Sequence, residues 1–320
     1  MKKMIALSLA VLMLLGMTAC GSTAAPSDDG KYTIGICHLV THDALDAATN
    51  GFMQAVKDEL GADNVTFDLQ NAAGDSNTCS SIANAFVSAE VDLIMANATP
   101  ALQAAQAATA DIPLLGTSVT EYSVALDLKD YEGVVGGNVS GTSDLAPLED
   151  QAAMLLEWFP DAKNVGLLYC SAEPNSKYQV EAVKALLEAE GVTCKLFPFA
   201  DSNDMPAVTN GACEFSDVLY LPTDNTVASG IDIIDGICRP AGVPIIAGEE
   251  GICAVAGVAT LSISYYDLGY TTGKMAASIL KGEADISTMK VEYAPAIKKY
   301  NPEICNALGL TAPEGYAAIG

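Results

Sequence analysis

His38 and His42 stand four residues apart and are the only histidines in this chain of 320 residues. On a helix, that spacing could hold a metal ion. The apolar run Tyr32–His38 predicts a strand instead, which places His42 in the turn after it. We therefore expect both histidines where this strand opens onto a binding cleft, with a solvated turn as the alternative. No metal site is predicted.

Three junctions between a predicted strand and a predicted helix carry residues that could bind a charged ligand. Thr99 and Pro100 predict a helix N-cap followed by proline at the first helical position. Ser143 with Asp144, and residues 223–226, repeat this arrangement. Free N–H groups at such helix starts can hold a carboxylate without an arginine. Asp224 could neutralise a ligand ammonium or could simply cap its helix, and both interpretations stay open.

The composition restricts the possible partners. The chain has 40 acidic and 15 basic residues and a net charge of −25, so it should repel nucleic acid and anionic lipid headgroups. Arg239 is the only arginine, which disfavours a phosphorylated ligand. The hydrolase, dinucleotide and zinc-protease motifs GxSxG, GxGxxG and HExxH are absent from the sequence. Residues 269–275 are faintly similar to a P-loop, but they are one residue short and fall within a predicted helix.

Strand-like apolar runs alternate with helical patterns along the chain, and the alternation restarts near residues 136–143. This order predicts two α/β units with parallel sheets covered by helices. A late helix at 266–281 and a strand near 290–293 could return to the first unit. Ligands of open α/β sheets bind beyond the carboxyl ends of the strands, so two facing lobes would enclose one cleft. The other expected strands are 32–38, 65–70, 91–95, 113–116, 164–170, 192–197, 217–221 and 243–247, and the helices between them are 43–60, 76–89, 99–110, 144–159, 175–190, 203–210 and 224–238.

The N-terminus has the pattern of an export signal. Lys2 and Lys3 precede an apolar run of fourteen residues, which is too short to span a bilayer. Small residues then lead to Cys20, an ending that resembles the bacterial lipobox. That resemblance implies cleavage before Cys20 and acylation of its sulfur, palmitate included. We predict a signal peptide at 1–19, a lipidated tether at 20–30 and anchoring to the cell membrane through Cys20.

Eight cysteines remain after Cys20. An even number in an exported protein permits disulfides. Several of them lie in apolar strand-like runs, however, where cysteine often acts as a small hydrophobic residue, and no CxxC motif is present. We expect mostly free, buried thiols. The eight are Cys37, Cys79, Cys170, Cys194, Cys213, Cys238, Cys253 and Cys305.

Taken together, these motifs resemble one family, the substrate-binding lipoproteins of ABC transporters that include the tryptophan-binding members. The resemblance runs from about residue 32 to residue 313. The matching stretches are IGICHLVTHDALDAA at 34–48, VTFDLQNAAGD at 65–75, DLIMANATPA at 92–101, GNVSGTSDL at 137–145, NVGLLY at 164–169, LPTDNTV at 221–227 and YYDLGYTTGKMAASILKG at 265–282.

The resemblance implies the type I periplasmic binding protein fold. It consists of two Rossmann-like α/β lobes with parallel sheets, a three-segment hinge and a ligand cleft between the lobes. The N-terminal lobe would comprise 31–141 and 268–291, and the C-terminal lobe 142–267 and 292–320. The implied function is that of an extracytoplasmic solute-binding lipoprotein of an ABC importer, without enzymatic activity, cofactor or metal. Its ligand would be a small zwitterion, most simply an amino acid and foremost an aromatic one, bound by hinge closure.

The implied partners are a permease in the membrane and its cytosolic ATPase, with the binding protein itself a monomer. Three departures from the family pattern stand out. His38 replaces a usual glutamine, Asp43 replaces a common proline, and Glu121 with Tyr122 replaces Asp-Pro. By matching position, the cleft is expected to include His42, Thr99, Pro100, Thr120, Asp144, Asn175, Asp224 and Glu249.

Two other functions stay open at this point. One is a metal-binding or enzymatic lipoprotein that uses His38 and His42 together with cleft carboxylates. The other is a ligand-sensing lobe that reports its closed state to a signalling receptor.

Overall fold

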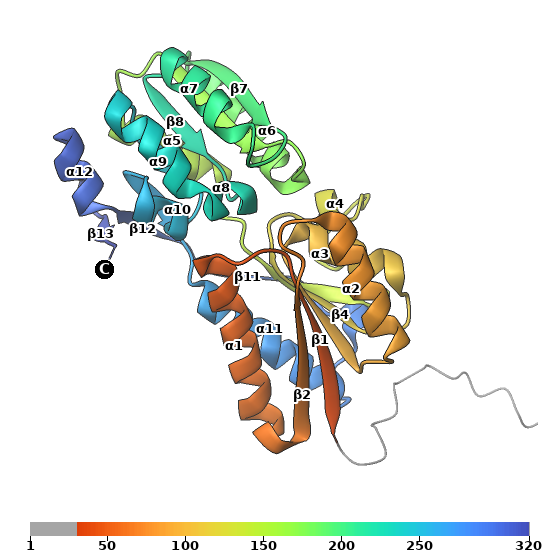
Figure 1. Cartoon of the computed structure of the whole chain (residues 1–320). Coiled ribbons are helices and arrows are strands. Elements are labelled where there is room, and N and C mark those ends of the chain that lie inside the picture. Colours follow the sequence, from red (N-terminus) through yellow and green to blue (C-terminus); the bar gives the residue numbers. More distant parts are fainter. Residues whose placement is uncertain (1–30, 320) are drawn as a thin grey trace, which may run out of the picture.

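The computed structural model describes residues 31–319, which form two α/β lobes joined by crossing segments (Figure 1). The predicted signal peptide 1–19, the tether 20–30 and Cys20 lie outside the described residues. Within 31–319, no helix is both long enough and apolar enough to cross a membrane. The predicted fold class, two lobes with mostly parallel sheets, is confirmed.

The N-terminal lobe is built on six described strands that all run parallel. The strands are β1 (Tyr32–His38), β2 (Val65–Asn71), β3 (Leu93–Asn97), β4 (Leu114–Val119), β5 (Val139–Ser143) and β11 (Glu292–Tyr293). They are ordered β11-β5-β4-β3-β1-β2. In the register of β1 and β3, Ile36 lies opposite Met95, and both side chains are fully buried. The accompanying helices are α1 (Asp43–Leu60), α2 (Ser76–Ser88), α3 (Thr99–Ala108), α4 (Tyr122–Ala125) and α11 (Tyr265–Leu280), with short 3-10 turns at Ala62–Asn64 and Ile286–Thr288.

The C-terminal lobe contains seven of the described strands, ordered β13-β12-β10-β9-β8-β6-β7. They are β6 (Asn164–Cys170), β7 (Thr193–Phe199), β8 (Val218–Leu221), β9 (Ile245–Ala247), β10 (Ala259–Ser262), β12 (Ile297–Tyr300) and β13 (Ala317–Ala318). Only the pairing of β12 with β10 is antiparallel among these strands. The helices are α5 (Leu148–Trp158), α6 (Pro174–Ala189), α7 (Met205–Phe215), α8 (Asn225–Ser229), α9 (Ile231–Ala241), α10 (Glu250–Val255) and α12 (Pro302–Leu308).

Helices α1 and α11 pack together at unusually close range, although they are far apart in the sequence (Figure 1). A Cβ atom at Gly269 would collide with the backbone carbonyl of Ala48, and one at Gly273 would press on Phe52. The glycines of the P-loop-like stretch therefore serve helix packing. Helix α11 thereby completes the N-terminal lobe with residues that follow most of the C-terminal lobe in sequence.

The chain crosses between the two sheets three times, after β5, after β10 and after β11. Ser143 and Tyr293 still pair within the N-terminal sheet, so the first and third crossings lie a few residues beyond the predicted limits 141 and 291. Helix α11, which begins at Tyr265, packs on α1, so the second crossing lies slightly before the predicted limit at 267.

Strand β5 was not predicted, and the helix expected at 144–159 begins later than expected. Its first residue is Leu148, with Pro147 at the N-cap, so Asp144 heads no helix. The segment VSGTS has only one apolar side chain, that of Val139, which is too few to indicate a strand, yet all five residues are buried. Gly141 makes this burial possible, because the hydroxyl of Tyr122 occupies the space of its missing side chain and donates to the Thr142 carbonyl at 3.1 Å.

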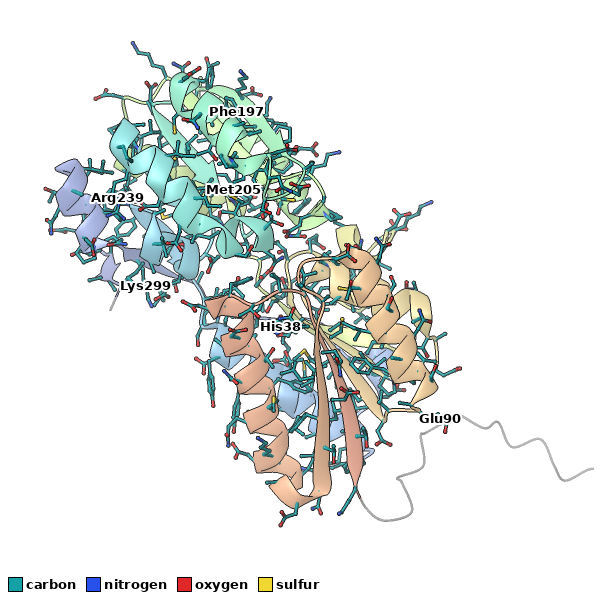
Figure 2. All side chains as sticks on the ribbon, viewed as in Figure 1. His38, Glu90, Phe197, Met205, Arg239 and Lys299 are labelled. Atoms are coloured by element: carbon teal, nitrogen blue, oxygen red, sulfur yellow. The ribbon has the colours of Figure 1, made fainter. Side chains whose placement is uncertain are left out.

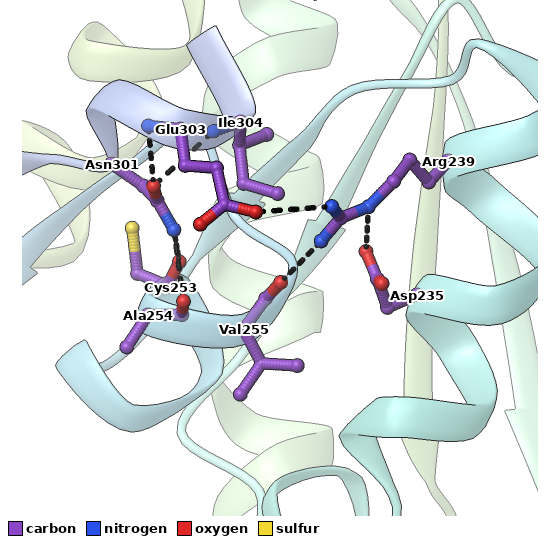
Figure 3. Close-up of polar contacts among 8 residues, drawn as sticks. All are labelled: Asp235, Arg239, Cys253, Ala254, Val255, Asn301, Glu303 and Ile304. Atoms are coloured by element: carbon purple, nitrogen blue, oxygen red, sulfur yellow. Dashed lines mark hydrogen bonds and ion pairs between the residues drawn. The ribbon is translucent and has the colours of Figure 1, made fainter. Parts of the chain in front are cut away.

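A polar network around Arg239 fixes the last helix to the C-terminal lobe (Figure 3). The guanidinium contacts Asp235 Oδ1 at 2.9 Å, the Val255 carbonyl at 3.0 Å and Glu303 Oε1 at 3.6 Å. Asn301 caps α12 and also donates to the carbonyl of Cys253 at 3.0 Å. Because the only arginine of the chain ties α9 to α10 and α12 on the outer flank of this lobe, it is unavailable to a ligand between the lobes (Figure 2).

Candidate functional site

The eight residues expected in the cleft all follow the carboxyl ends of strands. Five come from the N-terminal sheet, after β1, β3, β4 and β5, and three from the C-terminal sheet, after β6, β8 and β9. His42 is partly buried and the other seven are buried. The residues are His42, Thr99, Pro100, Thr120, Asp144, Asn175, Asp224 and Glu249.

Helix α3 begins at Thr99 as predicted, but its N-cap lies one residue earlier than predicted. Ala98 occupies the N-cap position, Thr99 is the first helical residue and Pro100 the second. Ala98 has a φ of 90°, a backbone strain that often marks binding sites. Among the described residues, no side chain caps this helix and nothing partners the Thr99 hydroxyl, which is 1% exposed. Within the described residues, the Thr99 hydroxyl therefore lacks a hydrogen-bond partner and the N-terminus of α3 lacks a side-chain cap.

Thr120 lies beside the crossing segment that carries Asp144. The hydroxyl of Ser143 donates to the Thr120 carbonyl at 2.7 Å and so holds the loop after β4 against the end of β5. Thr120 itself is 2% exposed. The contact keeps the backbone around Thr120 fixed where the N-terminal sheet meets the hinge.

Asp144 lies in the first crossing segment, between the two sheets. Its Oδ2 accepts a hydrogen bond from the hydroxyl of Tyr265 at 3.0 Å, which links two of the three crossings. Its Oδ1 is buried and has no hydrogen-bond partner of ordinary geometry among residues 31–319, although the Thr120 hydroxyl lies near enough to lower the pKa of the carboxyl. Burial is the main cause that raises the pKa of Asp144 to about 6. Asp144 is thus a buried acid with one oxygen open to a ligand.

Asp224 has both carboxylate oxygens occupied. Oδ1 accepts from the Val227 N–H at 2.8 Å, which caps α8, and Oδ2 accepts from the Cys170 N–H at 2.7 Å. Burial and, after it, the charge of Glu173 raise the pKa of Asp224 to about 8. Of the two interpretations left open by the sequence, this geometry favours the helix cap.

Glu249 is the N-cap of α10, a role that the sequence did not indicate. Its carboxylate accepts from the N–H groups of Gly251 and Ile252, each at 2.6 Å. Burial is the main cause that raises the pKa of Glu249 to about 7. This carboxylate is held rigidly at the edge of the cleft by the helix that it caps.

Glu173 is a central residue that sequence reasoning missed. Its Oε2 accepts from the backbone and side-chain nitrogens of Asn225 at 3.1 and 2.8 Å, and its Oε1 accepts from the backbone nitrogen and hydroxyl of Thr226 at 2.8 and 2.7 Å. A glutamate just before Pro174, where a strand gives way to a helix, was the available signal. Glu173 joins the loop after β6 to the start of α8.

Asn175 lies in the first turn of α6, beside Glu173. Its Nδ2 donates to Glu173 Oε2 and to the Thr223 carbonyl, both at 3.3 Å. The side-chain carbonyl Oδ1 is buried, and no described residue provides a donor for it. Asn175 therefore presents a second unfilled acceptor, this time from the C-terminal lobe.

The two histidines have different partners. His42 Nε2 lies 3.2 Å from Asn225 Oδ1, a hydrogen bond between the two lobes. His38 lies at the end of its lobe that faces the other lobe (Figure 2), and its ring contacts Thr49 Oγ1 at 3.0 Å and Asp46 Oδ1 at 3.2 Å. Burial lowers the pKa of both rings. Within the described part of the chain, no group of three or more His, Cys, Asp or Glu side chains could hold a metal ion.

Two cavities border this region. One of about 610 Å³ lies beside the hinge and is lined by both lobes, with Ala44 and Ala47 of α1 facing Glu249 and Tyr265. The other, of about 310 Å³, is lined mostly by residues with polar side chains, His38 among them. Departures at His38 and Asp43 from the family pattern therefore fall at the borders of these two cavities.

Known proteins resemble the chain over nearly its whole described length. Residues 33–318 match the family described as ABC transporter substrate binding protein. The tyrosine-binding protein of Clostridioides difficile (strain R20291) is 37% identical over 297 residues, which cover 88% of this chain and 85% of that protein.

Two solved structures share both the fold and about a third of the sequence of this chain. The ABC domain from Streptococcus pneumonia in complex with L-Trp has 31% identity and a TM-score of 0.85, with 90% of this chain and all of that chain covered. A ligand-free, open substrate binding protein with adhesive properties from Clostridium difficile has 38% identity and a TM-score of 0.68, with 90% and 99% covered. By its sequence and its two-lobe architecture, the chain belongs to the ABC transporter substrate binding protein family.

Proposed function

We propose that this protein captures a zwitterionic amino acid, foremost an aromatic one, for an ABC importer. Binding would occur by closure of the lobes around the ligand, without covalent chemistry. The tyrosine-binding relative and the L-Trp complex both support this ligand class. The greater structural similarity to the L-Trp complex than to the open relative, despite lower sequence identity, supports a closed arrangement of the lobes here.

The observation that carries the proposal is a set of buried polar atoms without partners among the described residues. Asp144 Oδ1 and Asn175 Oδ1 can only accept hydrogen bonds at neutral pH, and Asp144 lies in the first crossing segment whereas Asn175 belongs to the C-terminal lobe. Buried polar groups are almost always paired in native proteins, so unpaired ones in a cleft indicate the place of a ligand. Two acceptors, one of them ionisable, suit an ammonium group.

The opposite end of a zwitterion needs donors, and α3 supplies them. The Thr99 hydroxyl is buried without a partner, and the N-terminus of α3 carries no side-chain cap among the described residues. A helix N-terminus and a hydroxyl together can bind a carboxylate. This arrangement removes the need for an arginine, which agrees with the remote position of Arg239.

We propose that Glu249 and Asp224 line the same cleft and that His42 helps to hold the two lobes closed around it. Each acid holds the start of a helix, so the backbone around the ligand stays fixed when the lobes move. The interlobe bond of His42 to Asn225 adds a contact that exists only when the lobes are close. Pro100 and Thr120 complete the lining from the N-terminal lobe.

The same family membership supports a proposal for the cellular location and the partners of the protein. We propose that it works outside the cytoplasm as a monomer, that it delivers its ligand to a membrane permease driven by a cytosolic ATPase, and that it has no enzymatic activity. Its anchor would be the lipidated Cys20. The Cys20→Ala variant should lose its acyl chains and either be released into the medium or remain as an uncleaved precursor, and a variant that still carries lipid and fractionates with the membrane as before would contradict the anchor.

The ligand can be identified directly. Mass spectrometry of small molecules released by denaturing the purified protein should reveal an amino acid. A thermal-shift screen on refolded, ligand-free protein should then show aromatic amino acids raising the melting temperature, because a ligand that binds only the folded form stabilises it. Responses confined to sugars, peptides or metal ions would refute the proposed ligand class.

A further inference from the structure

Cys213 and Cys238 lie side by side in the C-terminal lobe, away from the residues of the cleft. Their sulfur atoms are 3.4 Å apart. Cys213 is near the end of α7 and Cys238 near the end of α9, two helices that pack against each other around one apolar core. We propose that this pair is a redox site, at which oxidation joins α7 to α9 by a disulfide.

The geometry requires little movement. Forming the bond shortens the distance between the sulfur atoms from 3.4 Å to about 2.05 Å. The apolar residues around the pair, among them Met205 and Ile234, already hold the two helices in place. Bond formation therefore needs the two sulfur atoms to approach by about 1.4 Å.

The solvent exposure of one of its two cysteines distinguishes this pair from the pair formed by Cys37 and Cys79. Cys213 is partly exposed, so a small oxidant can reach it, whereas Cys238 is 1% exposed. Cys37 and Cys79 also interact with each other, but both are fully buried. Cys194 is partly exposed like Cys213 and serves as a matched control.

The reaction is thiol–disulfide exchange with a small-molecule disulfide as oxidant. The Cys213 thiolate attacks that disulfide, forms a mixed disulfide and releases one thiolate. The Cys238 sulfur, after giving its proton to solvent, attacks the Cys213 sulfur and releases the second thiolate. The two cysteines lose two electrons and two protons, and the oxidant becomes two thiols.

The bond should affect stability more than ligand binding. It closes a loop between residues that are 25 positions apart, and it lies outside the cleft. Constraining the unfolded chain in this way should raise the unfolding midpoint by roughly 5–10 °C. Oxidation of the pair should therefore occur whichever ligand the protein binds.

The test uses the mature protein incubated with oxidised glutathione or with reductant, then alkylated, digested and examined by mass spectrometry. We expect Cys213 and Cys238 in one disulfide-linked peptide pair, Cys194 alkylated or glutathionylated but not joined to either, and the rise in midpoint only for the oxidised protein. The Cys213→Ser variant should lose both effects, and Cys194→Ser should retain them. A stable mixed disulfide on Cys213 with Cys238 still alkylatable after denaturation would overturn the proposal, as would two unmodified thiols.

Discussion

Replacement of Asp144 by asparagine should stabilise the free protein and weaken ligand binding. Burial raises the pKa of this carboxyl from 3.8 to about 6. An acidic group whose pKa is higher in the folded chain than in the unfolded chain is costly to ionise in the folded state. The stability of the fold therefore falls as the pH rises from the unfolded-state pKa to the folded-state pKa. At about 1.4 kcal/mol for each tenfold change, the ionised carboxylate lowers the stability of the free protein by about 3 kcal/mol above pH 6.

Asparagine carries no charge and avoids this penalty, although its amide nitrogen would replace an unpaired oxygen and need an acceptor. We therefore expect a gain of about 1–3 kcal/mol in the free energy of unfolding at pH 7.5, and little gain at pH 4. Tyr265 can still donate its hydroxyl to the remaining side-chain oxygen, so the link between the crossing segments should persist.

The affinity of the Asp144→Asn variant for its ligand should fall, although the stability of the free protein rises. Breaking a desolvated charge pair costs about 2–5 kcal/mol, which is a loss of roughly thirtyfold to several thousandfold in affinity. In the unsubstituted protein only about one tenth of Asp144 is ionised at pH 5, so affinity should be roughly tenfold lower there than at pH 7.5. Glu249 and Asp224 are present in both proteins, so the difference between the two pH profiles reports on Asp144 together with the pKa of Glu249, which the charge of Asp144 raises.

Urea unfolding of ligand-free protein at pH 4 and pH 7.5 measures the first effect, and calorimetry with tyrosine and tryptophan between pH 5 and 8 measures the second. Asp75→Asn is the matched control, because Asp75 caps a helix on the exposed surface. The reasoning fails if the Asp144→Asn variant binds as tightly as the unsubstituted protein, or if both show the same pH profile.

Three further substitutions test other parts of the site and fold. Asp224→Asn should retain the helix cap, because asparagine caps as well as aspartate, and should change affinity less than about threefold, whereas calorimetry showing more than a tenfold loss would make Asp224 the counter-charge. His42→Ala should reduce affinity by about 2–12-fold, because the bond to Asn225 favours closure, and scattering should show a less compact ligand-bound state. Gly269→Ala should cost about 1–3 kcal/mol in urea unfolding by forcing α11 off α1, whereas Gly211→Ala, at an open helical position, should not destabilise.

Much of the fold could be predicted because its signals are local. The strand Tyr32–His38 and the helix Asp43–Leu60 were predicted with their observed limits, since apolar runs and helical periodicity need no knowledge of distant residues. Strand β5 was missed for the opposite reason. Its burial depends on Tyr122 filling the space at Gly141, a contact between segments 20 residues apart.

The position of the candidate residues beyond the carboxyl ends of the strands could also be predicted, but the contacts that each one makes could not. Parallel strands place their carboxyl ends at one edge, so Asp144 and Asp224 were expected in the same cleft. Which of them is free to meet a ligand depends on partners elsewhere in the chain. Asp224 is satisfied by the backbone of Cys170, whereas Asp144 is satisfied at only one oxygen by Tyr265, 121 residues away.

The close packing of α1 and α11 has a consequence for export and folding. During secretion the chain emerges in order, and residues 31–143 appear without the helix that covers α1 and without strand β11. Until residues 265–293 follow, the apolar surface around Phe52 and Val56 lacks its neighbour Met275. The N-terminal lobe thus emerges first but is completed late, because its last helix and strand follow the second crossing. The crossings therefore limit the order in which the lobes can fold, in addition to forming the hinge. During that interval the exposed apolar surface of this lobe is most prone to aggregation, so chaperones outside the membrane would be needed most then.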